Sequence, residues 1–214
     1  MAMNKPMLIT RPHYDVVTNY LCSWSESIIT LASEKGRDVY DLKGDKAERV
    51  RFQSYCKAKM PALLFLNGHG NADVITGHND EPLVDGSDHF GNSVVYARSC
   101  ECAKRLGVKL VENGLRTFIG YTRKFIFGYL TTKITRPRED MLAALFLESS
   151  NLIVSTLLKG HTAQEADARG KEAMYRNFRK MIASTASYEE RYAARWTWGN
   201  IKSQVILGSP NGRV

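Results

Sequence analysis

The chain has 214 residues, 43% of them hydrophobic and 24% charged, which is the composition of one ordinary globular domain with its own buried core. No apolar run approaches the roughly 20 residues of a membrane-spanning helix, the first residues lack the apolar core of a secretory signal, and four unevenly spaced cysteines do not make a disulfide framework. We therefore expect a cytoplasmic protein with reduced thiols, and its net charge of +8 suits either an acidic partner or an ordinary solvated surface.

Strand and helix patterns alternate along the first half of the chain. Short apolar runs predict strands at 6–11, 38–42, 62–67, 93–98 and 115–121. An amphipathic helix is expected from Val17 to Ala32, ending before Gly36, and further helices are expected at 44–59 and 101–112. Strands joined by helices form right-handed crossovers, so this order predicts a mostly parallel sheet with helices on both faces.

The second half is expected to be more helical. Residues 141–160 are apolar nearly all round, which indicates one or two buried helices. Thr162 and Glu165 have the spacing of a capping box and predict the start of another helix. A last strand is expected at 204–208, and the basic segment 122–137 is expected to be a loop. The whole pattern predicts an α/β fold with three layers and a central sheet of about six strands.

Two of the predicted strands end in residues that can carry chemistry. LLFLNGHGN, residues 63–71, stops at His69 between two glycines, and VVYARSCECA, residues 94–103, stops at Cys100. In an open parallel sheet, catalytic groups gather at the edge formed by the carboxyl ends of the strands. Because adjacent strands lie about 4.8 Å apart, we expect His69 and Cys100 to meet at that edge.

A thiol beside an imidazole is a catalytic arrangement. A free cysteine has a pKa near 8.5, so an adjacent histidine is needed to remove or stabilise its proton at neutral pH. Cys100 would attack a peptide carbonyl, His69 would protonate the leaving amine, and the backbone N–H groups of Gly70 and Cys100 would bind the oxyanion. A zinc site that also uses Cys102 is disfavoured, because no second cysteine pair supports it. We therefore expect no metal and no cofactor.

The blocks LLFLNGHG and VVYARSC resemble those of the caspase-like cysteine peptidases (clan CD), and are most similar to gingipain-like and CHAT-type domains. Further similarity lies in FIGY at 118–121, LLKGHTAQEA at 157–166 and VILGSPNGRV at 205–214. The resemblance implies a single caspase-like domain over residues 1–214, with a three-layer sandwich and cysteine endopeptidase activity. It also implies a protein or peptide substrate and activation by cleavage or by a protein partner.

The resemblance leaves the nature of the substrate pocket open. Asp15 is placed like the acidic residue of relatives that cleave after arginine or lysine, whereas Arg11 is placed for a preference for acidic residues. An apolar pocket is a third alternative. Arg98 and Ser99 precede the cysteine, where metacaspase-type relatives have acidic residues, and we include Ser99 and the loop residue Asp73 among the expected substrate-binding residues.

A second hypothesis assumes the same fold but no catalytic activity. In it the chain is a catalytically silent module that binds a protein or a nucleic acid through a basic surface, with cations at Arg123, Lys124, Lys133, Arg136 and Arg138. Few aromatic residues are interleaved with these cations, so nucleic acid is the less favoured partner. The peptidase hypothesis is preferred, because a binding module has no physical need for a thiol beside an imidazole.

Overall fold

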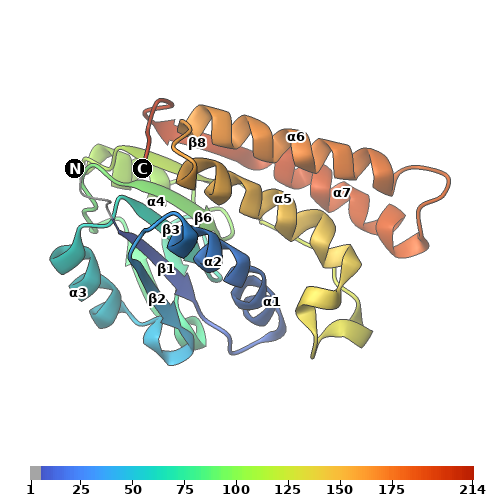
Figure 1. Ribbon diagram of the computed structural model, residues 1–214, viewed down its shortest axis with the longest axis horizontal. Helices are drawn as coiled ribbons and strands as arrows, with labels where there is room; N and C mark the ends of the chain where they lie inside the picture. The colour runs from blue at the N-terminus through green and yellow to red at the C-terminus, as the bar shows by residue number, and fades with distance from the viewer. Residues whose placement is uncertain (1–5) are drawn as a thin grey trace.

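The computed structural model describes residues 6–214, and its centre is a six-stranded sheet with the strand order β2-β1-β3-β6-β7-β8 (Figure 1). The first five strands are parallel to one another, and β8 runs antiparallel to β7. The strands are β1 (Met7–Arg11), β2 (Val39–Lys43), β3 (Leu63–Asn67), β6 (Val94–Arg98), β7 (Thr117–Tyr121) and β8 (Gln204–Gly208). The predicted six-stranded, mostly parallel sheet is confirmed.

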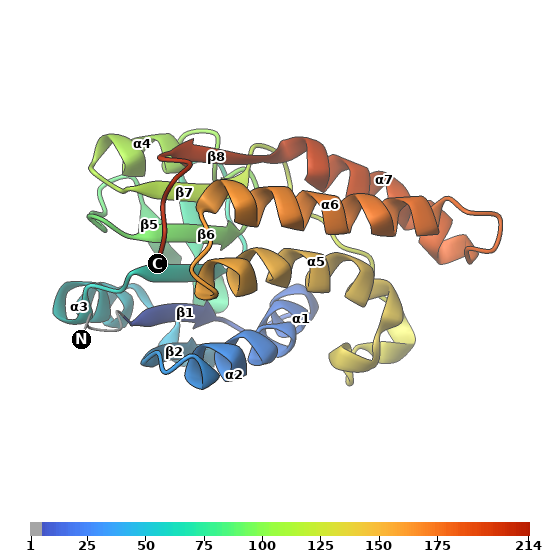
Figure 2. The same ribbon diagram turned by 45° about the horizontal axis from the view of Figure 1, so that its top comes forward.

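Helices cover both faces of this sheet and make three layers (Figure 2). One face carries α1 (Val16–Trp24), α2 (Glu26–Glu34), α5 (Met141–Leu158), α6 (Ala163–Met181) and α7 (Tyr188–Ser203); the other carries α3 (Arg49–Lys59) and α4 (Leu106–Glu112). Each central strand is buried on both sides, since Met7 and Ile9 face the first group of helices while Leu8 faces the second. Two buried faces explain why β1, β3, β6 and β7 read as continuous apolar runs in the sequence.

Shorter elements lie in the loops between the main helices and strands. A two-stranded antiparallel hairpin, β4 (Val74–Thr76) and β5 (Pro82–Asp85), follows β3. Single turns of 3-10 helix are η1 (Gly44–Lys46), η2 (His78–Asp80), η3 (Thr131–Lys133) and η4 (Pro137–Glu139). Neither the hairpin nor α7 is among the elements expected from the sequence. The expected helices at 44–59 and 101–112 are shorter, beginning only at Arg49 and at Leu106.

The single helix expected from Val17 to Ala32 is two helices, α1 and α2, separated at Ser25. The cause lies in the buried side chain of Arg98, whose Nη2 donates to the Leu21 carbonyl at 3.2 Å and to Ser25 Oγ at 2.7 Å. Ser25 Oγ itself donates to the same carbonyl at 2.6 Å. Side chains that compete for a helix carbonyl in this way bend or break the helix.

Helix α5 corrects the prediction that no apolar run approaches the length of a membrane-spanning helix. By length and composition alone, Met141–Leu158 is apolar enough to cross a membrane. In the fold 72% of this helix is buried against the rest of the protein. A helix that is apolar nearly all round is also what the core of a layered protein requires, so the feature is weak support for a membrane span.

The capping box predicted at the start of α6 is confirmed. Thr162 Oγ1 accepts the backbone N–H of Glu165 at 3.2 Å, and Glu165 Oε2 accepts the backbone N–H of Thr162 at 2.8 Å. This reciprocal pair satisfies donors that the first turn of a helix otherwise leaves free.

Candidate active site

The two strands that end at His69 and Cys100 are neighbours, as predicted. β3 pairs in parallel with β6, and Asn67, the last residue of β3, lies opposite Arg98, the last residue of β6. His69 and Cys100 are each two residues past these partners, so both chains leave the sheet at the same edge. Figure 2 shows β1 pointing to the end of the sheet beyond which α5, α6 and α7 project.

The ring of His69 is held by Asp15. Nε2 of His69 lies 2.6 Å from Oδ2 of Asp15, which is the N-cap residue of α1. The other carboxylate oxygen of Asp15 accepts the backbone N–H and the hydroxyl of Thr18, each at 2.7 Å. Burial alone would raise the pKa of Asp15, but the hydrogen bonds from Thr18 and the contact with His69 outweigh it and hold the pKa below its usual value. Asp15 is therefore a carboxylate that fixes the orientation of the His69 ring. The other ring nitrogen, Nδ1, has no hydrogen-bond partner within residues 6–214.

The backbone of His69 is tied directly to the segment that carries Cys100. The carbonyl oxygen of His69 accepts Ser99 Oγ at 2.7 Å and the backbone N–H of Thr76 at 3.0 Å. Gly70 approaches the same hydroxyl so closely that a Cβ there would lie 2.3 Å from Ser99 Oγ and 2.5 Å from the Val74 carbonyl oxygen. Only glycine fits at this position, and the two loops are packed as one unit.

Cys100 is half-buried, and its Sγ lies 3.9 Å from the carbonyl oxygen of Phe125. Burial raises the pKa of this thiol above its ordinary value, although the hydrogen bond to Phe125 and the charge of Lys124 act in the opposite direction. Within the described part of the chain, no hydrogen bond joins Sγ to the His69 ring. In this resting arrangement Cys100 is a neutral thiol that needs a base before it can act as a nucleophile.

Two backbone amides beside the pair are free to donate. Throughout residues 6–214, neither the N–H of Gly70 nor the N–H of Cys100 donates to a protein acceptor. Gly70 forms a β-bridge to Ile75 in which its neighbours, His69 and Asn71, make the hydrogen bonds. Free N–H groups at the partly exposed end of a sheet are suitable donors to a developing oxyanion.

Three of the residues expected to bind substrate have other roles. Arg11 is only 4% exposed, its Nε and Nη2 bind the Asp41 carboxylate at 2.8 and 2.5 Å, and its Nη1 donates to the Cys22 carbonyl. The structure therefore contradicts the expected contact of Arg11 with substrate, because alternate strand residues face opposite sides and this one faces the layer of α1 and α2. Asp15 binds His69 rather than a substrate cation, and Ser99 is buried and positions His69.

Asp73, the fourth expected substrate-binding residue, is exposed at the start of the hairpin. Its carboxylate makes two hydrogen bonds with the guanidinium of Arg105, one of them 2.7 Å long, and these hydrogen bonds lower the pKa of Asp73. Cys102 is fully buried below the turn that follows Cys100, and burial raises its pKa to about 12. Within residues 6–214 no three potential ligands of the histidine, cysteine and carboxylate types come together as a metal site would require.

A residue missed in the sequence holds one wall of the site. Asn200 of α7 is buried; its Oδ1 accepts the backbone N–H of Ile126 at 3.1 Å, and its Nδ2 donates to the Ile126 carbonyl at 2.7 Å. Phe125 and Phe127 are buried on either side of this anchor. The segment after β7 is thus attached to α7 beside Cys100, and nothing in the local sequence pattern indicates this long-range pair.

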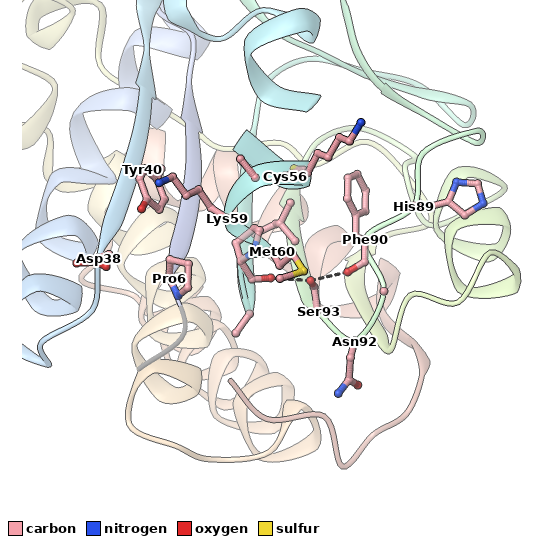
Figure 3. A pocket seen from close by; sticks show the side chains of 16 residues that line it. Pro6, Asp38, Tyr40, Cys56, Lys59, Met60, His89, Phe90, Asn92 and Ser93 are labelled. Carbon is pink, nitrogen blue, oxygen red and sulfur yellow. Dashed lines mark hydrogen bonds between the residues drawn. The ribbon is translucent and has the colours of Figure 1, made fainter. Parts of the chain in front are cut away.

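A separate cavity lies at the other edge of the sheet. It has a volume of about 650 Å³ and is lined by Pro6, Ala62 and Ser93, which directly precede β1, β3 and β6 at the amino edge of the sheet (Figure 3). Cys56 also lines it, but burial raises the pKa of that thiol to about 12. His69 and Cys100 are at the opposite edge, so this cavity is not their substrate site.

Comparison with known proteins identifies the architecture. No protein-family profile and no curated protein sequence matches the chain. Among solved structures, the complex of the pro- and mature domains of RgpB from Porphyromonas gingivalis superimposes with a TM-score of 0.60 at 8% sequence identity, covering 99% of this chain and 48% of the RgpB chain. The fold is a caspase-like sandwich. At this identity the likeness concerns the fold alone, and the chain spans about half the length of the RgpB chain.

Proposed function

We propose that this caspase-like domain is a cysteine peptidase, with Cys100 as nucleophile and His69 as general base and acid. The observation that carries the proposal is the 2.6 Å contact between Asp15 and Nε2 of His69 at the strand end next to Cys100. A carboxylate that fixes one ring nitrogen stabilises the imidazolium and directs the other nitrogen towards a nucleophile.

The catalytic steps follow from these groups. His69 takes the thiol proton, Sγ of Cys100 attacks the peptide carbonyl carbon, and the carbonyl oxygen becomes an oxyanion held by the N–H groups of Gly70 and Cys100. The C–N bond then breaks, and the leaving amine receives the proton from His69. Water, deprotonated by the same histidine, hydrolyses the thioester and restores the thiol, with the second peptide fragment leaving as an acid.

The resting geometry supports a requirement for activation. Sγ is turned to the Phe125 carbonyl rather than to the His69 ring, so substrate or a protein partner must bring the sulfur and Nδ1 together. Such catalytic hydrogen bonds are often long in unliganded enzymes and shorten in the complex with substrate.

Covalent labelling tests the proposal. Purified protein is treated with peptidyl acyloxymethyl ketones that carry Arg, Lys, Asp or Leu on the acyl side, and the adduct is mapped by intact mass and peptide digestion. We expect labelling at Cys100 and not at the buried Cys22 or Cys102, with loss of labelling in Cys100→Ala and His69→Ala. If labelling at Cys100 proceeds equally without His69, the chain has no catalytic dyad; if no probe labels with any candidate activator, the non-catalytic binding module is favoured.

Asp15→Asn and Asp15→Ala separate orientation of His69 from helix capping. Asparagine is also a good N-cap but lacks the charge, so Asp15→Asn is expected to lower kcat/KM about 10-fold or more with little loss of stability. Asp15→Ala should show the same kinetic loss and also lose about 1 kcal/mol of unfolding free energy. Peptide hydrolysis and urea unfolding measure the two effects, and native activity in Asp15→Asn would contradict the orienting role.

The lowered pKa of Asp15 also predicts a pH dependence of stability. Because the folded pKa lies below the ordinary value of 3.8, the ionised carboxylate stabilises the fold at higher pH, and this contribution is lost as the pH falls through the folded value. Between pH 5 and 2, the free energy of unfolding in urea should therefore fall more for the native protein than for Asp15→Asn, in which only the other carboxylates titrate. If the free energy of unfolding changes with pH in the same way in both proteins, the ionised Asp15 carboxylate does not stabilise the fold.

A further inference from the structure

A second cleft opens beside Cys100, between the segment after β7 and helix α7. It has a volume of about 290 Å³. Its lining residues are Glu101, Arg123, Lys124, Ile126, Arg195, Trp196, Gly199 and Asn200. Two chain segments connect it to the nucleophile, because Glu101 directly follows Cys100 and Lys124 precedes Phe125, whose carbonyl oxygen is 3.9 Å from Sγ. A peptide whose carbonyl reaches Cys100 therefore has this cleft next to it.

The lining of the cleft carries an excess of positive charge. Arg123, Lys124 and Arg195 are all exposed, and none of them forms an ion pair with any residue in 6–214. The one carboxylate in the lining, Glu101, is paired with Lys104 at 2.6 Å. The lining thus keeps an excess of positive charge that an acidic ligand would neutralise.

The walls of the cleft are fixed rather than loose. The two hydrogen bonds between Asn200 and the backbone of Ile126 fasten one wall to the other. The guanidinium carbon of Arg195 lies 4.0 Å from the centre of the Tyr192 ring and 5.2 Å from that of Trp196. Arg195 therefore lies over an aromatic surface while its side chain is exposed, an arrangement suited to recognition of a carboxylate.

From these observations we propose that the cleft is the specificity pocket of the peptidase and that it selects an acidic side chain on the residue whose carbonyl Cys100 attacks. The inference rests on the proposed function, since it assigns a substrate class to that site. The selecting cations are Arg123, Lys124 and Arg195, on elements that follow the nucleophile in sequence. Arg11, the candidate from the sequence, has its guanidinium bound to Asp41 and takes no part.

The test compares labelling rates for peptidyl acyloxymethyl ketones that differ only in the acyl-side residue: Asp, Glu, Asn, Leu or Arg. We expect Asp or Glu to label Cys100 at least about 10-fold faster than Asn or Leu, because a charge-assisted pair is lost with the neutral side chain. Arg195→Gln and Arg123→Gln should each remove much of this difference. Lys57→Gln, the same change of charge beside the cavity at the opposite edge, should leave it unchanged.

Charge reversal gives the sharper version of the test. Arg195→Glu is expected to slow the Asp probe and accelerate the Arg probe, a gain that unfolding or general damage cannot produce. Iodoacetamide, which needs no specificity pocket, reports the state of the Cys100 thiol in each variant. It also identifies any loss of labelling that comes from damage to the thiol rather than to the cleft.

Different outcomes contradict the acidic specificity pocket and the proposed peptidase function. If the Leu or Arg probe labels native Cys100 fastest and in a His69-dependent manner, the peptidase stands and the acidic pocket is overturned. If a single-stranded oligonucleotide blocks labelling while the Asp and Asn probes react equally, the cations serve nucleic acid and the inference is also overturned. If iodoacetamide alkylates Cys100 equally with and without His69 and no ketone reacts, the proposed function itself fails.

Discussion

His69→Ala is expected to lower kcat/KM for peptide hydrolysis by about 10²- to 10⁴-fold, the range that a general acid-base group contributes. Burial raises the pKa of Cys100, so the thiol is protonated at neutral pH and depends on the imidazole to become a nucleophile. The loss should therefore appear in the chemical step rather than in substrate binding. Because the His69 side chain is 34% exposed at the edge of the sheet, its removal should change stability little.

The matched control for this variant is His89→Ala. His89 is an exposed histidine that lines the cavity at the amino edge of the sheet, so it shares the residue type without the site. Single-turnover hydrolysis and circular dichroism of both variants separate chemistry from folding. Equal activity in His69→Ala and in the native protein would exclude the dyad, whatever the fold.

Arg98→Met is expected to destabilise the fold by about 3–5 kcal/mol, because it leaves several buried acceptors without a donor and each such group costs about 1–3 kcal/mol. Arg98 is fully buried, and no carboxylate within residues 6–214 pairs with it. Its five donor contacts go to neutral acceptors, which are Asn67 Oδ1, Ser150 Oγ, Asn151 Oδ1, Leu21 O and Ser25 Oγ. The guanidinium also lies 4.7 Å from the centre of the Phe65 ring, so a single side chain connects two strands with α1, α2 and α5.

Urea unfolding measures this effect, with Arg179→Met as the control. Arg179 is exposed near the end of α6, and its replacement should change stability by less than about 0.5 kcal/mol. If Arg98→Met does not fold, Arg98→Lys provides the measurable intermediate, since an ammonium can satisfy at most three of the five acceptors. A loss below about 1 kcal/mol in Arg98→Met would mean that water replaces the guanidinium and that the network is not structural.

Four strands of the sheet, β1, β3, β6 and β7, could be predicted because they are buried on both faces and therefore appear in the sequence as apolar runs. Only short-range information is needed to find such runs. The hairpin of β4 and β5 was missed because its strands are three and four residues long and mix polar with apolar side chains. Helix α7 was missed because YEERYAARWTWGNIKS is polar and aromatic without a clear apolar stripe, and its burial depends on contacts with α5 and α6.

The candidate site was predictable where it depends on strand ends. His69 and Cys100 follow from two apolar runs that stop at chemically active residues, and their neighbouring strands follow from the parallel order. The role of Asp15 also has a signal in the sequence, because Asp15 and Thr18 have the spacing of a capping box, which fixes the carboxylate at the start of α1. Arg11 could not be assigned, because its partner Asp41 is 30 residues away and only the strand pairing brings them together.

The tight contact between Gly70 and Ser99 limits how this scaffold could be redesigned. A methyl group at position 70 would meet the Val74 carbonyl oxygen at 2.5 Å, and that atom belongs to the backbone and cannot rotate away. A combinatorial library for new substrate preferences should therefore keep glycine at this position. The varied positions should instead be Arg123 and Arg195, whose side chains are exposed beside Cys100.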